Sequence, residues 1–138
     1  FLYFLKGTTL IYAGQEYKCE TTPSLFEKDV FERDESKNIS AYISAMAELK
    51  KTVLSPEDHF KGRADDENDI AILKRDDNVT LKLGVFSLKG KSADLKAEVP
   101  DGEYTNQIDG GRVTVKDGVL HCEGRPIVIV SDRVEKFE

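Results

Sequence analysis

Three polar side chains near the N-terminus lie where a buried strand would end. Residues 7–13 form a short run of strand composition, and Tyr12, Gln15 and Glu16 lie at or just beyond its carboxyl end. In parallel α/β structures the loops that leave the carboxyl ends of the strands converge on one face, where binding and catalytic groups gather. These three side chains are therefore candidates for a binding or catalytic face. The alternative is that Glu16 only ties its loop to neighbouring residues.

Other side chains that could bind a ligand or take part in catalysis lie in less favourable sequence contexts. The acidic run at residues 65–69 offers hard oxygen ligands of the kind that calcium prefers, but the sixth position of such a loop is Ile70 instead of glycine, and the twelfth is Asp76 instead of glutamate. His59 and His121 lie in different segments, with no serine or cysteine nucleophile motif to match them. The sequence therefore favours a solvated linker at the acidic run over a calcium site.

The cysteine and glycine patterns indicate no cofactor. Cys19 and Cys122 are too few for a disulfide framework and have no metal-ligand spacing around them, so we expect reduced thiols, with a bridge between them as the alternative. Residues 110–111 are a glycine pair between two predicted strands, which is typical of a hairpin turn and not of a phosphate loop. We expect neither a metal nor a cofactor in this chain.

The composition is that of a folded, mildly acidic protein. Of 138 residues, 39% are hydrophobic and 33% are charged, with a formal net charge of -6. This is too apolar for a disordered chain, and the negative charge argues against a nucleic-acid partner. No run approaches the roughly 20 apolar residues that a helix needs to span a bilayer, so we expect no membrane partner.

Hydrophobic periodicity divides the chain in two. Residues 38–51 carry apolar side chains at helical spacing, with Ser36 and Asn38 available as caps and two lysines at the C-terminal end. From residue 70 the period becomes two, and turn residues separate about seven short runs, which predict a Greek-key β-sandwich. The predicted parts are residues 1–54, a linker at 55–68 and an all-β domain at 69–138.

The N-terminal segment also resembles a known motif. The eighth-strand motif of the α-amylase family of glycoside hydrolases (glycoside hydrolase family 13) is matched by Gly7, Ile11, Tyr12, Gly14 and Glu16. Residues 25–29 are similar to the Leu-Phe-x-x-Asp stretch that follows this strand in the family, while Thr9 and Arg33 replace a proline and a tryptophan. Residues 99–105 and 113–118 resemble turns of the β-domain that follows the barrel in this family.

This resemblance implies a mixed fold: the C-terminal remnant of a (β/α)8 TIM barrel, with one strand and one helix, followed by the antiparallel sandwich. A whole barrel takes about 250 residues. In the family, the nucleophile, the general acid and a third carboxylate follow the fourth, fifth and seventh strands, so the resemblance places them all before Phe1. Retaining cleavage needs two carboxyl groups about 5–5.5 Å apart across the bond, and one strand end cannot supply both. We expect no catalytic residue here. The resemblance implies instead that Tyr12, Gln15 and Glu16 shape the substrate pocket of the intact enzyme or hydrogen-bond within it.

The same resemblance implies a parent protein that is a retaining α-glycosidase, with an α-glucan such as starch or maltodextrin, or an oligosaccharide, as its substrate. This fragment would complete and stabilise the barrel, and the missing barrel portion or a second copy would pack on residues 1–54. The alternative is that the sandwich is a non-catalytic carbohydrate-binding or structural module. In that case Phe86 and Tyr104 are the aromatic side chains best suited to stack on a sugar.

Overall fold

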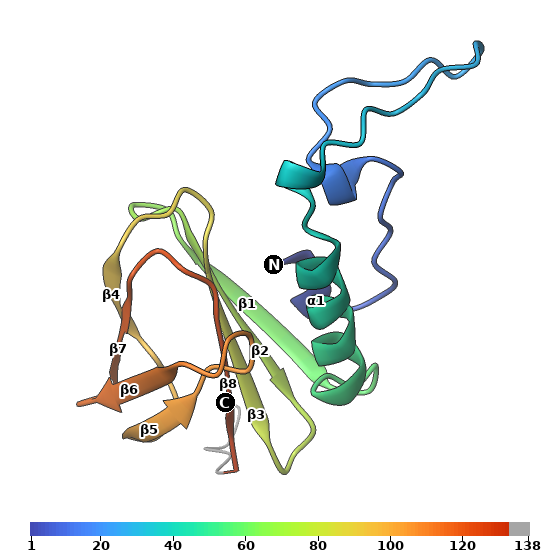
Figure 1. Ribbon diagram of the computed structural model, residues 1–138. Helices are drawn as coiled ribbons and strands as arrows, with labels where there is room; N and C mark the ends of the chain where they lie inside the picture. The colour runs from blue at the N-terminus through green and yellow to red at the C-terminus, as the bar shows by residue number, and fades with distance from the viewer. Residues whose placement is uncertain (133–138) are drawn as a thin grey trace.

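Figure 1 shows the computed structural model, which describes residues 1–132. Two β-sheets face each other, and helix α1 stands beside the sheet that contains β1, β2 and β3. Residues 8–38, which we call the arm, run out from this body and return to the start of α1. In chain order the elements are η1 (Leu2–Phe4), η2 (Gln15–Tyr17), η3 (Glu35–Lys37), α1 (Ser40–Thr52), β1 (His59–Asp65), β2 (Ile70–Asp76), β3 (Leu81–Ser87), β4 (Ala93–Lys96), β5 (Gly102–Thr105), β6 (Arg112–Lys116), β7 (Val119–Cys122) and β8 (Ile127–Ser131).

The two sheets form a Greek-key β-sandwich. The first sheet has the strand order β1-β2-β3-β8, and the second has the order β4-β7-β6-β5. All of these neighbours are antiparallel. In the second sheet β5, β6 and β7 follow one another as hairpins, and β7 then lies beside β4, which is the Greek-key arrangement. The predicted fold class, a barrel remnant followed by an antiparallel sandwich, is confirmed.

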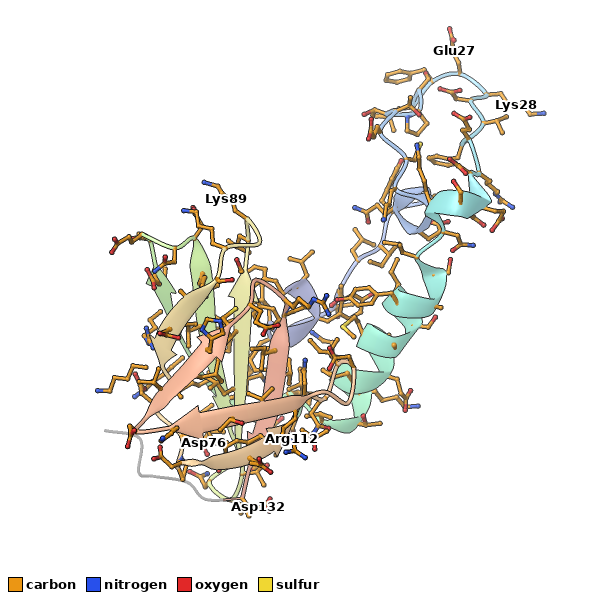
Figure 2. All side chains as sticks on the ribbon, turned by 60° about the vertical axis from the view of Figure 1, so that its left-hand side comes forward. Glu27, Lys28, Asp76, Lys89, Arg112 and Asp132 are labelled. Carbon is orange, nitrogen blue, oxygen red and sulfur yellow. The ribbon has the colours of Figure 1, made fainter. Side chains whose placement is uncertain are left out.

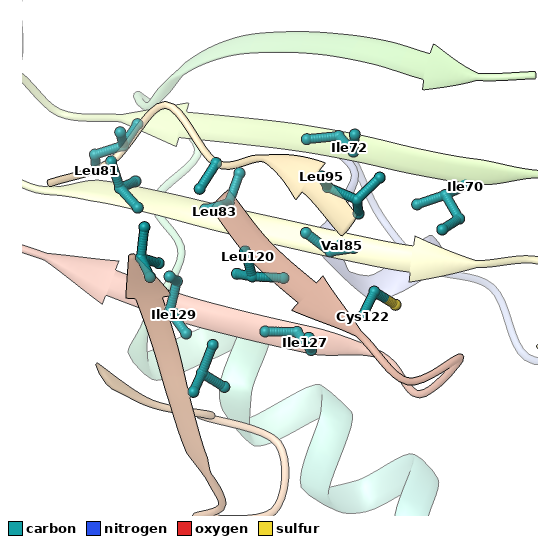
Figure 3. Close-up of a cluster of buried hydrophobic side chains, with 14 residues drawn as sticks. Ile70, Ile72, Leu81, Leu83, Val85, Leu95, Leu120, Cys122, Ile127 and Ile129 are labelled. Carbon is teal, nitrogen blue, oxygen red and sulfur yellow. The ribbon is translucent and has the colours of Figure 1, made fainter. Parts of the chain in front are cut away.

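The main core fills the space between the sheets. Leu83, Leu120 and Ile129 are fully buried there, and Figure 3 shows them with their neighbours from both sheets. β6 illustrates the cause, because its side chains alternate between exposed and buried along the strand. Burial of a large aliphatic side chain contributes about 1.5–3 kcal/mol to stability, so this core supplies most of what holds the sandwich together.

A second apolar cluster covers the outer face of the first sheet. Phe4 of η1 packs there on Phe86 of β3, with ring centroids 5.6 Å apart. Leu49 and Leu54, from the end of α1 and the segment after it, join the same cluster together with Leu73. β3 is therefore buried on both faces, from Leu81 to Phe86, although its alternating sequence had predicted a half-buried strand.

Helix α1 spans Ser40–Thr52, within two residues of the predicted range. The N-cap residue is Ile39, which makes no side-chain cap bond, but the side chain of Asn38 just before it accepts a hydrogen bond from the N–H of Ser40 (2.9 Å). Of the two predicted caps, Asn38 therefore contacts the start of the helix, and Ser36 bonds Asp34 instead. At the other end, Lys50 Nζ donates to the carbonyl of Leu5 at 2.7 Å. Met46 and Leu49 form the buried side of the helix. The helix is thus attached to η1, which in turn lies on the sheet.

Two boundaries differ from the predictions. Residues 8–12 form no strand, because a barrel strand needs neighbouring strands to pair with, and the described residues supply none at this position. The predicted linker at 55–68 contains β1, which pairs with β2 along its whole length. The polar residues of β1 suit an edge strand, which is why its sequence looked like a linker. Of the predicted all-β domain, residues 133–138 lie outside the described residues.

Candidate functional site

Tyr12, Gln15 and Glu16 lie together on a tight turn at the base of the arm. The main-chain N–H of Tyr12 donates to Oε1 of Gln15 (2.8 Å), and that of Gly14 donates to Oε2 of Glu16 (2.9 Å). The carbonyl of Glu16 accepts the N–H of Ile39 (2.8 Å), which joins this turn to the residue that follows the arm and precedes α1. The Gln15 and Glu16 side chains therefore hold the shape of this turn, and the Tyr12 side chain is left exposed beside it.

Gly14 is required at this turn for two reasons. Its φ of 96° lies in the left-handed region, which side chains disfavour. In addition, a Cβ at this position would come within 2.9 Å of Cδ1 of Phe31. The returning half of the arm thus packs against the motif glycine, and the resemblance at this position has a physical basis in both backbone and packing.

The rest of the arm presents large apolar side chains to solvent. Phe26 is 97% exposed and Leu10 is 80% exposed. Figure 2 shows the tip of the arm, marked by Glu27 and Lys28, standing well away from the sandwich. Other exposed apolar residues of the arm are Ile11, Tyr12, Leu25 and Val30. Apolar groups gathered in this way mark an interaction surface.

Four charged residues connect η1 and the segment after α1 to the sandwich, and we call them the junction cluster: Asp58, Arg75, Asp77 and Lys82. Asp58 is fully buried, and Arg75 and Lys82 are 2% and 4% exposed. Oδ2 of Asp58 lies 3.2 Å from Nε of Arg75, and Oδ1 lies 3.0 Å from Nζ of Lys82. Lys82 Nζ also donates to Oδ2 of Asp77 at 2.6 Å. Two cations and two carboxylates therefore neutralise one another.

Main-chain groups complete the junction cluster. Arg75 donates from Nη1 to the carbonyl of Phe4 (3.1 Å) and from Nη2 to the carbonyl of Ser55. The N–H of Ser55 donates to Oδ2 of Asp58 (3.0 Å), and Lys6 Nζ donates to the Asp58 carbonyl (2.7 Å). Buried charges of this kind are tolerated only when they are paired and hydrogen-bonded. The cluster therefore fixes both η1 and the segment after α1 on the outer face of the first sheet.

The pairing changes the pKa of two cluster members. The hydrogen bond from Lys82, followed by main-chain bonds at the tight turn around Thr80, holds the pKa of Asp77 far below its usual range. Burial alone would lower the pKa of Lys82, but hydrogen bonds to Asp77 and Asp58 outweigh burial and raise it. Both groups are therefore charged across the physiological range.

The acidic run considered as a calcium loop forms a turn between β1 and β2. The Asp65 carboxylate accepts hydrogen bonds from the N–H and Nδ2 of Asn68, and Asp69 pairs with Lys89 (2.9 Å) and Lys91 (2.5 Å). Across residues 1–132, no group of three or more potential ligand side chains is arranged to hold a metal ion. The described part of the chain likewise contains no helix long and apolar enough to cross a membrane.

The junction cluster was missed in the sequence because its cations alternate with apolar residues. Arg75 and Lys82 occupy outward positions of β2 and β3, where a period of two predicts contact with solvent. Distant segments contact them there: η1 and the segment after α1 contact Arg75, and Asp58 from that same segment contacts Lys82. The available signal was weak: Asp58 precedes β1 within a polar stretch and gives no pattern of its own.

Taken together, fold and junction define a β-sandwich domain that carries a terminal helix and an apolar arm on one sheet. Residues 61–129, half of the chain, match the family described as bacterial α-amylase C-terminal domain. The chain belongs to this family, and the expected resemblance to the C-terminal part of α-amylases is confirmed. No match was found among curated proteins.

Three solved structures share the fold. An α-amylase from Lactobacillus plantarum is 23% identical, with a TM-score of 0.72 over 88% of this chain and 29% of its own. The noncanonic maltogenic α-amylase AmyB from Thermotoga neapolitana is 16% identical, with a TM-score of 0.70 over 96% of this chain and 35% of its own. An Anoxybacillus α-amylase is 17% identical, with a TM-score of 0.56 over 79% of this chain and 25% of its own. This chain thus spans about a third of these proteins or less.

Proposed function

We propose that this chain is the C-terminal part of a retaining glycoside hydrolase that acts on α-glucans. In this proposal residues 1–54 complete a (β/α)8 barrel, and the sandwich holds them in place through the junction cluster. The family membership supports the proposal, as do the three similar structures, which are all α-amylases and one of which is described as maltogenic. The catalytic carboxylates belong to the rest of the barrel.

The exposed apolar arm, which lies between η1 and α1, carries this proposal. Leu10 and Ile11 are consecutive and both exposed, so the segment 8–13 is apolar on both sides, as barrel strands are when helices cover one face and the barrel interior the other. A parallel barrel strand also needs a neighbour along each edge. A second copy related by two-fold symmetry would supply only one such edge, so the remaining barrel is the partner that fits.

Within that barrel, we assign Tyr12, Gln15 and Glu16 to the substrate pocket at the end of the eighth strand. Gln15 and Glu16 would act by fixing the turn, as their hydrogen bonds to the Tyr12 and Gly14 main chain suggest. Tyr12 would contact the substrate directly, since its ring stands free of the turn. These are supporting roles, because none of the three is paired with a second carboxyl group as retaining cleavage requires.

The first experiment determines the intact mass of the native polypeptide that contains this sequence, with tandem mass spectrometry of the peptides before Phe1. We expect a polypeptide several hundred residues longer that hydrolyses maltooligosaccharides with retention of anomeric configuration, which proton NMR detects. A native polypeptide that starts near Phe1, or one without hydrolytic activity, would overturn the proposal.

Variants of that longer polypeptide test the assigned roles. Tyr12→Ala is expected to lower kcat/KM for maltooligosaccharides at least tenfold, which corresponds to about 1.4 kcal/mol of lost binding. The matched control is Leu88→Ala, which removes an exposed apolar side chain from the β3–β4 connection of the sandwich. An equal effect of the two changes would remove Tyr12 from the substrate pocket.

A further inference from the structure

The second sheet is split between β6 and β7. These strands pair only at Val115 with Leu120 and at Lys116 with Val119, next to the turn that joins them. Farther along, β6 continues to pair with β5, and β7 continues to pair with β4. Figure 1 shows β6 and β7 pointing away from each other beyond their shared end. A notch of about 330 Å³ opens at this split, and it is lined by β6, β7, the start of β8, the loop before β6 and the loop between β7 and β8.

The notch combines an apolar floor with a rim that carries both charges. Val113 and Ile127 line it and are themselves part of the main core, so they form its floor. Two guanidinium groups and two carboxylates lie around the rim, from Arg112, Arg125, Asp109 and Glu123. Arg112 also pairs with Glu103 outside the notch (3.2 Å), and the lining residue His121 pairs with Asp94 (2.6 Å). The rim thus presents groups of both signs that are partly paired already, which favours a ligand without net charge that both donates and accepts hydrogen bonds.

Main-chain groups of β6 add to the hydrogen-bonding capacity of the notch. In an antiparallel sheet the N–H and C=O groups of alternate residues point toward each neighbouring strand. Residues 112–114 of β6 have register partners in β5 but none in β7. Their main-chain groups on the β7 side therefore face the notch, where a hydroxyl group or water can satisfy them.

We propose that this notch is a secondary binding site for a short, neutral, hydroxyl-rich saccharide. Sugar hydroxyls both donate and accept, which suits the mixed rim and the free edge of β6, and the C–H faces of a sugar ring suit Val113 and Ile127. The volume lies at the lower end of the range of about 300–1,000 Å³ for small-molecule sites. The choice of an α-glucan as the saccharide rests on the function proposed above.

Aromatic stacking contributes nothing to this site. Phe86 is buried under η1 on the opposite sheet, and the Tyr104 hydroxyl donates to the carbonyl of Pro100 (2.7 Å), with its ring against the main core. Neither residue is the sugar platform that the sequence suggested. Without a platform, binding is expected in the millimolar range, which suits a site that retains a polymeric substrate and not one that selects it.

The test is a titration of the 138-residue chain with maltoheptaose, followed by amide shifts in ¹H–¹⁵N NMR spectra. We expect saturable shifts at Val113, Thr114 and residues 109–111. Arg112→Ala is expected to weaken the apparent affinity at least fivefold, and its side chain is 75% exposed, so the fold is retained. Lys116→Ala is the matched control, since it removes a cation from the same face of the same strand outside the notch.

Three outcomes overturn the proposal: no saturable shift, shifts confined to the arm, or larger shifts at the notch with inorganic phosphate at equal ionic strength. The last outcome would mean that the rim selects anions. The first and third outcomes leave the barrel proposal untouched, because the notch lies on the second sheet and the junction cluster on the first. Shifts confined to the arm would instead fit the substrate pocket to which Tyr12 is assigned. Conversely, an inactive parent polypeptide with saturable binding at the notch would overturn the barrel proposal alone.

Discussion

Nζ of Lys82 lies 3.0 Å from Oδ1 of Asp58, and this contact joins the middle of the first sheet to the segment that leaves helix α1. Asp58 is fully buried and also meets Arg75, so one carboxylate serves two cations from neighbouring strands. Since each cation is almost fully buried too, neither can turn to water if the carboxylate is lost. The junction cluster is therefore the place where single substitutions have the largest electrostatic effect.

Replacing Asp58 by alanine is expected to lower the free energy of unfolding by about 3–5 kcal/mol, because Arg75 and Lys82 would remain buried without their shared partner. Urea unfolding followed by circular dichroism measures this change. Asp94→Ala is the control: Asp94 pairs with His121 at 2.6 Å, but both side chains are well exposed, so we expect less than about 1 kcal/mol. Similar losses for the two variants would contradict the role of burial.

The Asp77 carboxylate makes the contribution of the junction cluster to stability depend on pH. Its pKa is lowered on folding, chiefly by Lys82, so it stabilises the fold above its unfolded pKa of about 3.9, and this contribution is lost as the pH falls further. The side chain is partly exposed, so Asp77→Asn should cost about 1 kcal/mol at pH 7. The difference from the native chain should shrink below pH 4. A difference that stays constant between pH 7 and pH 3 would argue against this ion pair.

Two glycines with similar backbone angles allow the free-energy cost of backbone strain to be distinguished from the cost of steric crowding. Gly124 has a φ of 84°, and a Cβ there would lie 2.3 Å from the carbonyl oxygen of Gly90 on the neighbouring connection. Gly110 has a φ of 76° and nothing within 4 Å of such a Cβ. Gly110→Ala should cost about 1–2 kcal/mol from the backbone alone, and Gly124→Ala at least about 1 kcal/mol more. Thermal unfolding of both variants checks the order, which equal melting temperatures would refute.

We expect the exposed apolar side chains of the arm to contribute to association and not to the stability of this chain. Replacing Leu25 and Phe26 together by serine should change the free energy of unfolding by less than about 0.5 kcal/mol. Phe86→Ala, in the cluster under η1, should cost about 3–5 kcal/mol. Self-association at high concentration, measured by sedimentation velocity, should fall in the double variant. A large stability loss there would place the arm within the cooperative fold.

Alternation of apolar and polar residues was enough to predict most of the sandwich. Ile70, Ile72, Leu83 and Val85 all face the main core, as a period of two requires. The helix was predicted within two residues because its apolar spacing and the Asn38 cap are local signals. Features that depend only on neighbours in sequence were therefore accessible without a structure.

Features that depend on distant segments were not accessible. Arg75 is buried because the carbonyls of Phe4 and Ser55 come to it from other parts of the chain, and nothing near Arg75 records this. β1 was read as a linker because an edge strand can be polar on both faces when only one neighbour pairs with it. The role of Tyr12, Gln15 and Glu16 in a substrate pocket stays a prediction, since it concerns a barrel interior that these residues only border.

The contact between Phe4 and Phe86 also bears on how such a sandwich passes from one protein to another. A recombination breakpoint at the start of β1 would uncover the outer face of the first sheet, where Leu73 and Phe86 lie under η1 and the end of α1. It would also separate Arg75 and Lys82 from Asp58. We therefore expect the smallest part of this chain that can be transferred without loss of stability to be larger than the sandwich itself and to include η1 and α1.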